Sequence, residues 1–94
     1  MHAEQCVEIT VYGKVQGVYF RQSTLQKALE LGVRGCVRNR RDGSVNILAA
    51  GPADAVIALI AWCRTGPALA RVYKVDIEPL DHINEQGFSI LRDA

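Results

Sequence analysis

The pair Asp42-Gly43 joins two strand-like segments, and this hairpin signal constrains the fold more than any other feature of the sequence. Residues 36–41 and 44–49 are strand-like runs, and an Asp-Gly pair between two such runs predicts a β-hairpin with a two-residue turn. One segment of helical periodicity precedes this hairpin and another follows it. Each predicted helix therefore lies between strands.

The segments before the hairpin predict a strand followed by a helix. Residues 6–12 alternate between apolar and polar side chains up to Gly13, which is typical of a half-buried strand that ends at the glycine. Residues 21–31 place apolar side chains, Leu29 among them, at helical spacing, and Gly32 follows as a helix-ending glycine. The first half of the chain thus predicts strand, helix and hairpin in that order.

The second half of the chain repeats the alternation of helix and strand. Gly51-Pro52 interrupts the pattern before a helix predicted over residues 53–64, whose apolar stripe includes Ile57. Two later segments have the residues of strands, 71–78 and the shorter 88–91. The predicted order is β-α-β-β-α-β with one extra strand.

This order predicts an α+β protein of the ferredoxin-like, split βαβ class. Its antiparallel sheet carries both helices on one face, because two helices that link antiparallel strands of one sheet must share a face. A length of 94 residues fits a single domain over residues 1–94. The chain is 49% hydrophobic and 22% charged, which excludes a disordered polar chain.

Charge and cysteine content restrict the partners and the compartment. The net charge is only +1, although residues 14–41 hold seven Lys or Arg side chains and one Glu, so no bulk positive field favours nucleic acid. Three widely spaced cysteines suit neither a disulfide framework nor a zinc site. No signal peptide or membrane span is evident. We expect a soluble cytoplasmic monomer without metal, cofactor, nucleic-acid or membrane partners.

The loop between the first predicted strand and helix has the composition of an anion site. It runs from Gly13 to Arg21, and its candidate phosphate-binding residues are Val15, Gln16, Gly17, Val18, Tyr19 and Phe20. Unpaired N–H groups at a helix start, the positive end of the helix dipole and a guanidinium together favour phosphate. The alternative is that the glycines only shape a tight connection and Arg21 is solvated.

Asn39 is the second candidate, because it shares a strand face with the apolar Val37. That face turns toward the helices and can bring the Asn39 amide beside the loop, where it accepts and donates hydrogen bonds. The alternative is a strand-end Asn that satisfies the backbone of the Asp42-Gly43 turn. Spacing alone favours this second interpretation.

Five segments of the chain together closely resemble the acylphosphatase family: residues 13–21, 35–39, 42–45, 66–72 and 88–90. The resemblance implies a metal-independent enzyme that cleaves the carboxyl-phosphate bond of acyl phosphates, with inorganic phosphate as product or inhibitor. It implies that Arg21 binds the phosphate and that Asn39 orients the attacking water. Cys36 departs from the family pattern, which often has an aromatic residue there.

Two other functions suit the same order of elements. An RNA-binding module would stack bases on aromatic side chains of the open sheet face. Aromatic residues make up only 6% of the chain, which leaves mainly Tyr12 and Tyr73 for that role. A non-catalytic phosphate-binding module would use the same loop as the enzyme. Turnover of an acyl phosphate separates the hydrolase from both alternatives.

Overall fold

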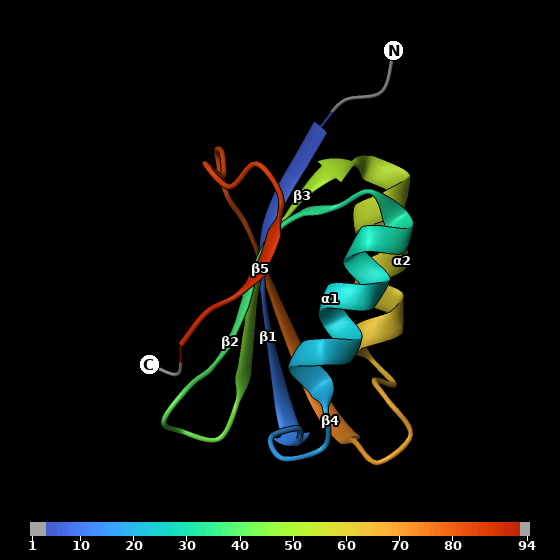
Figure 1. The fold of residues 1–94 in the computed structure, drawn as a ribbon, viewed down its shortest axis with the longest axis vertical. Helices are drawn as coiled ribbons and strands as arrows, with labels where there is room; N and C mark the ends of the chain where they lie inside the picture. The colour runs from blue at the N-terminus through green and yellow to red at the C-terminus, as the bar shows by residue number, and fades with distance from the viewer. Residues whose placement is uncertain (1–3, 93–94) are drawn as a thin grey trace.

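A computed structural model describes residues 4–92 as a five-stranded sheet with two helices packed against it (Figure 1). The elements in chain order are β1 (Glu4–Lys14), α1 (Phe20–Leu31), β2 (Arg34–Asn39), β3 (Val45–Pro52), α2 (Ala53–Cys63), β4 (Arg71–Pro79) and β5 (Phe88–Ile90). Both helices cover the same face of the sheet, as the sequence predicts for a ferredoxin-like α+β fold (Figure 1).

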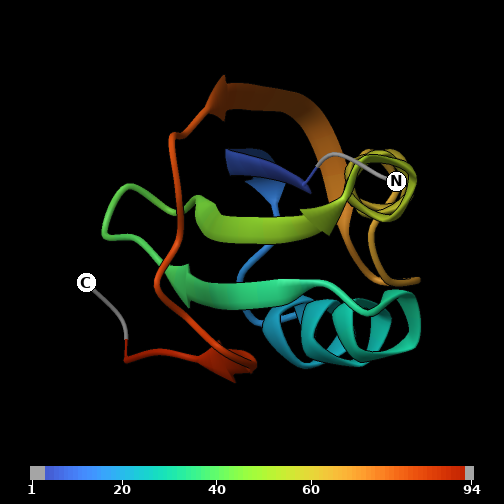
Figure 2. The same ribbon diagram turned by 90° about the horizontal axis from the view of Figure 1, so that it is seen from above.

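The strand order is β4-β1-β3-β2-β5, and the sheet is mixed rather than wholly antiparallel. The first four strands pair in antiparallel fashion, as predicted, whereas β5 runs parallel to β2, with Val37 opposite Ile90. The parallel pairing follows from the connection between β4 and β5. This segment crosses from one edge of the sheet to the other on the face away from the helices (Figure 2).

The crossing segment is fastened to the open face of the sheet by a buried side chain and by several hydrogen bonds. Ile83 is 7% exposed, and Arg34 Nε donates to the Glu85 carbonyl oxygen at 3.0 Å. Cys36 lies on this face beside Glu85 and is itself buried. The small thiol therefore occupies a covered position of the sheet, on the face opposite to Asn39.

The predicted hairpin forms, with a longer connection than two residues. Strand β2 ends at Asn39 and β3 begins at Val45, so residues 40–44 connect the two strands. The connection is closed by hydrogen bonds between its own residues: Arg40 N donates to Ser44 O at 2.9 Å, and Ser44 N donates to Asp42 Oδ1 at 2.9 Å. These bonds replace the ladder that a two-residue turn would have continued.

Strand β1 also differs from its prediction, because Gly13 lies within the strand and does not end it. The pairing with β4 continues through Lys14 after a register shift between Tyr12 and Gly13. Gly13 adopts φ 133°, and a Cβ atom there would lie 2.1 Å from the Arg71 carbonyl oxygen. Glycine thus permits the close approach of β1 and β4 at this bulge.

The core lies between the helices and the inward face of the sheet, where Val7, Ile9 and Val11 are buried as the alternation predicted. Ala28, Val56 and Cys63 of the predicted apolar stripes are buried, as expected, whereas Leu29 and Ile57 are 64% and 59% exposed, so each helix is turned slightly away from its predicted stripe. The buried helix residues are Phe20, Thr24 and Ala28 in α1 and Val56, Leu59 and Cys63 in α2. Thr24 tolerates burial because its hydroxyl donates to the Phe20 carbonyl oxygen at 2.7 Å.

The contact between Phe20 and Trp62 accounts for part of this rotation. Their ring centroids lie 5.4 Å apart, so each helix turns an aromatic residue toward the other.

Between residues 4 and 92, neither helix has the length and apolar character needed to cross a bilayer.

Candidate active site

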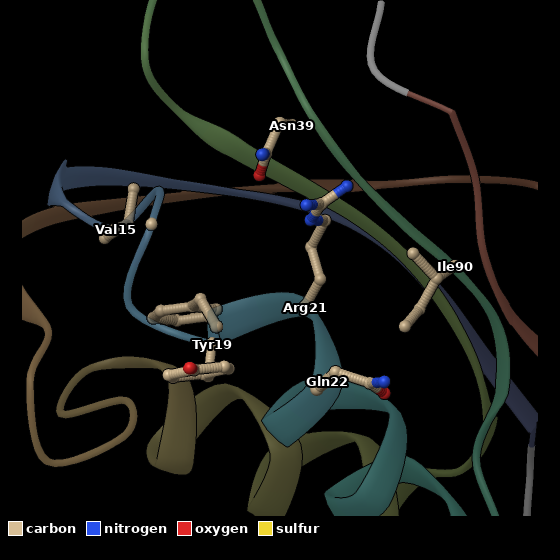
Figure 3. Close-up of a pocket in the computed structure, with 8 residues that line it drawn as sticks. Val15, Tyr19, Arg21, Gln22, Asn39 and Ile90 are labelled. Atoms are coloured by element: carbon tan, nitrogen blue, oxygen red, sulfur yellow. The ribbon is translucent and has the colours of Figure 1, made fainter.

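A pocket of about 470 Å³ opens where the loop after β1 meets the start of α1 and the end of β2 (Figure 3). Its lining residues are Val15, Gly17, Tyr19, Phe20, Arg21, Gln22, Asn39 and Ile90. The pocket therefore brings together the two regions that the sequence singled out, which are 18 residues apart at Arg21 and Asn39. Figure 3 shows the side chains of these two residues directed toward one another.

The start of α1 has no side-chain cap. Tyr19 is the N-cap residue and its side chain makes no capping hydrogen bond, so it does not satisfy the first-turn N–H groups. The first turn contains no acidic residue that could compete with a bound anion. Arg21 adds a guanidinium to the positive end of the helix dipole, and the arrangement favours a phosphate-sized anion.

Asn39 is only 7% exposed, and its amide oxygen accepts no hydrogen bond from the described part of the protein. Among residues 4–92, Asn39 Oδ1 is the one buried side-chain nitrogen or oxygen atom with no hydrogen-bond partner in the protein. A buried polar atom of this kind is costly unless a ligand or water satisfies it. This observation favours a functional role for the Asn39 amide.

The turn beyond Asn39 does not depend on this amide. Asp42 Oδ1 accepts the Ser44 backbone N–H and, at 2.6 Å, the Ser44 hydroxyl. These two hydrogen bonds from Ser44 stabilise the charged carboxylate and lower the pKa of Asp42 below its usual value. The hydrogen bonds of the turn are thus made by Asp42 and Ser44, and Asn39 Oδ1 takes no part in them.

Gln16 has a different position from the one its place in the loop suggests, because its side chain turns away from the pocket. Gln16 Nε2 donates to the carbonyl oxygens of Arg40 and Ser44 at 2.7 and 2.9 Å. These carbonyls belong to the connection that begins directly after Asn39. Gln16 thus ties the loop to the segment that carries Asn39, and we assign it a positioning role.

Replacement of Gln16 by Met is expected to lower kcat by up to about a hundredfold, because a small displacement between loop and amide spoils the reacting geometry. The hairpin should stay folded, since Arg40 O still accepts from Gly43 N and Ser44 O still accepts from Arg40 N. Gln26→Met, at an exposed position of α1, is the matched control. A folded Gln16→Met variant with the kcat of the original protein would contradict the assignment.

The other predicted loop residues divide between pocket and core. Val15, Gly17, Tyr19 and Phe20 line the pocket, whereas Val18 is buried in the core and does not reach it. The backbone N–H groups of the loop remain candidates for phosphate contacts, and that role stays a prediction.

Sequence reasoning missed two lining residues, Gln22 and Ile90. Gln22 follows Arg21 in the first helical turn, so its position near the helix start was a signal for it. Ile90 reaches the pocket only because β5 pairs in parallel with β2, which places Ile90 beside Val37, two residues before Asn39. A pairing between such distant segments leaves no local signal.

The basic residues around Asn39 lie outside the pocket lining. Arg38 neighbours Asn39 in β2, so its side chain emerges on the opposite face of the sheet. Arg40 Nη2 lies 3.1 Å from Glu8 Oε2, which partly neutralises it. Arg21 is therefore the one arginine among residues 4–92 that lines this pocket.

The cysteines are free thiols and two of them are buried. Burial raises the pKa of the Cys63 thiol to about 12 and, together with nearby Glu85, also raises the pKa of Cys36. Both side chains are therefore protonated at neutral pH and are poor nucleophiles. In the described part of the chain, no group of three or more His, Cys, Asp or Glu side chains is placed to hold a metal ion.

These features define a ferredoxin-like α+β protein with a candidate anion-binding pocket at a strand-to-helix loop, bordered by an arginine and a buried amide. Comparison with known proteins agrees with this class and narrows it. The family model described as Acylphosphatase matches residues 7–90. The chain belongs to the acylphosphatase family.

Individual relatives span nearly the whole chain. An acylphosphatase of Methylococcus capsulatus is 49% identical over 94% of this chain and 97% of its own length. The solved structure of an acylphosphatase from Coxiella burnetii matches with a TM-score of 0.90 and 39% identity, over 94% of this chain and 93% of that one. Full-length HypF, at 22% identity and a TM-score of 0.90, shares the fold over 99% of this chain but only 13% of its own.

Proposed function

We propose that this protein hydrolyses the carboxyl-phosphate bond of acyl phosphates by in-line attack of a water molecule. In this mechanism Arg21 and the N–H groups of the loop hold the phosphate, and Asn39 orients the water. The observation that supports it most directly is the buried Asn39 Oδ1 without a protein hydrogen-bond partner, in the same pocket as Arg21. Membership of the acylphosphatase family supports the choice of substrate.

The chemistry of an acyl phosphate suits a site with so few functional groups. The leaving group is a carboxylate, whose conjugate acid has a pKa of about 4, so it departs at neutral pH without being protonated. No general acid is therefore required. Among residues 4–92, those that line the pocket include no Asp, Glu, His or Lys, which is consistent with catalysis without a general acid.

Arg21 and the start of α1 stabilise the charge of the transferred group. During phosphoryl transfer, negative charge is spread over three equatorial phosphate oxygens, and catalysis depends on positioning and electrostatic stabilisation. A planar guanidinium can donate two parallel hydrogen bonds to these oxygens. The first-turn N–H groups of α1 supply further donors without any rearrangement of the protein.

Asn39 positions the nucleophile and does not act as a base, because an amide takes up no proton near neutrality. Its carbonyl oxygen accepts a hydrogen bond from water and directs the water's lone pair at phosphorus. The new P–O bond forms as the bond between phosphorus and the carboxyl oxygen breaks, and that bonding pair leaves with the carboxylate. The water's proton passes to a phosphate oxygen, so the products are a carboxylate and inorganic phosphate.

The proposal is tested by incubating the protein with benzoyl phosphate and acetyl phosphate and measuring released phosphate. Turnover well above the rate without protein is the expected result. Phosphate binding without turnover would instead indicate a non-catalytic phosphate-binding module. Binding of single-stranded RNA without turnover would indicate an RNA-binding module. In such a module Tyr12 would be the main aromatic residue of the open sheet face, but the Lys74 ammonium already lies over its ring, 5.0 Å from the centroid.

Neither a metal ion nor a thiol takes part in the proposed mechanism, and this yields a prediction. Dialysis against a chelator should leave kcat and KM unchanged. The triple variant Cys6→Ser, Cys36→Ala, Cys63→Ala should also keep both constants, measured on protein whose fold is checked by circular dichroism. Loss of activity after chelation, restored by a divalent cation, or inactivity of the folded triple variant would contradict the mechanism.

Several expectations accompany the proposal. We expect residues 1–94 to act as one domain and as a monomer, in the cytoplasm. We also expect neither nucleic acid nor a membrane among its partners. Sedimentation of the purified protein tests the oligomeric state.

A further inference from the structure

Tyr19 combines an unusual backbone conformation with an exposed aromatic ring. It has φ 63° and ψ 25°, and it is the one non-glycine residue with positive φ among residues 4–92. This left-handed region is unfavourable for a residue with a bulky side chain, whereas Gly and Asn adopt it readily. The ring is 74% exposed, so burial in the core does not compensate for the conformation.

The position of Tyr19 connects this feature to the pocket. Tyr19 is the N-cap of α1 and one of the residues that line the pocket. A pocket of about 470 Å³ lies within the range of sites that hold small organic molecules, roughly 300 to 1,000 Å³. It therefore has room for the acyl group as well as the phosphate.

In-line geometry determines where the acyl group lies. If Asn39 holds the attacking water, the carboxylate must leave from the opposite side of the phosphorus atom. In Figure 3, Asn39 lies above the level of the Arg21 guanidinium and Tyr19 lies below it. The acyl group of a substrate bound at Arg21 therefore extends toward the Tyr19 ring.

We propose that the Tyr19 ring forms the subsite for the acyl group and favours substrates with a planar, apolar acyl group over substrates with a small one. The inference rests on the proposed function, because it uses the in-line arrangement of water and leaving group. An exposed aromatic ring gains most from a partner that covers it, and offset stacking gives that partner a preferred orientation. A benzoyl group fits this description, whereas an acetyl group covers little of the ring.

The test uses two stable analogues in which CH₂ replaces the bridging oxygen: phenacylphosphonate for benzoyl phosphate and acetonylphosphonate for acetyl phosphate. The original protein should bind phenacylphosphonate more tightly. Tyr19→Asn, which tolerates the left-handed backbone, should reduce this preference about threefold to tenfold, the range that aromatic pairs contribute. Tyr19→Phe should retain the preference. The inhibition constant of inorganic phosphate, which has no acyl group, should stay the same in both variants.

Tyr73→Asn is the matched control, because Tyr73 is 78% exposed and does not line the pocket. This variant should keep the preference between the two analogues. An unchanged preference in Tyr19→Asn would overturn the inference, as would a loss of affinity of equal size for both analogues and phosphate. Turnover assays separate the Tyr19 subsite from the proposed function. If the analogues bind with the expected preference but neither acyl phosphate is turned over, only the proposed hydrolysis is refuted.

Discussion

Replacement of Arg21 by Gln is expected to lower kcat by about a thousandfold or more and to weaken the binding of inorganic phosphate. Arginines that stabilise a transferred phosphoryl group contribute effects of this size, because charge on the phosphate oxygens increases toward the transition state. Arg21 is the one arginine among the described residues that lines the pocket, so no neighbour replaces it there. Steady-state kinetics with benzoyl phosphate and the inhibition constant of phosphate measure the two effects.

Arg21→Lys separates charge from geometry at the same position. Lysine keeps the positive charge but lacks the planar pair of donors, so we expect activity to stay far below that of the original protein. Arg64→Gln is the control, because Arg64 is exposed at the end of α2 and lies outside the pocket lining. Near-normal activity of folded Arg21→Gln protein would exclude the proposed site.

Asn39→Ala is expected to lower kcat by about a hundredfold or more while the affinity for phosphate is retained. Loss of one oriented polar group from a preorganised site typically has this effect on rate. Phosphate affinity should persist because the donors assigned to the phosphate belong to Arg21 and the start of α1, on other elements. The competitive inhibition constant of inorganic phosphate measures binding without any need for turnover.

The comparison of these two constants decides the role of Asn39. Proportional losses of phosphate affinity and kcat in a folded variant would make Asn39 a binding or structural residue. Unchanged values of both would support the strand-end role that spacing alone favoured. Asn84→Ala, in the exposed segment between β4 and β5, controls for a general effect of removing an amide.

Stability measurements on Asn39→Ala add an independent check. A buried oxygen without a protein partner contributes little to stability, and its removal can even relieve a desolvation cost. We therefore expect the free energy of unfolding to change little relative to the effect on rate. A loss of stability without loss of activity would contradict a functional assignment.

The predicted elements agree with the structure wherever a local pattern defined them. The alternation of residues 6–12 identified the buried face of β1, and Gly32 ends α1 in a left-handed conformation, with its N–H directed at the Ala28 and Leu29 carbonyls. The Asp42-Gly43 pair located the hairpin. These features depend on residues close together in the chain, so the sequence carries their signals directly.

Predictions about helix faces were less accurate, because apolar spacing does not specify which of two adjacent stripes packs inward. Leu29 and Ile57 fit a helical stripe but remain exposed. The contact between Phe20 and Trp62 joins the helices across different parts of the chain and contributes to their rotation. Tertiary packing therefore overrides the local pattern at these positions.

The sequence by itself determined the order of elements, and it predicted an anion-binding loop before α1 and, through the family resemblance, the two residues on which the proposed mechanism rests, Arg21 and Asn39. Only the tertiary structure decided the parallel pairing of β5, the tie from Gln16 to the hairpin and the side of the pocket on which Tyr19 lies. The physical reason is distance along the chain: the Gln16 hydrogen bonds join residues 24 and 28 positions apart. Such contacts form only when the whole sheet brings these segments together, so no local pattern encodes them.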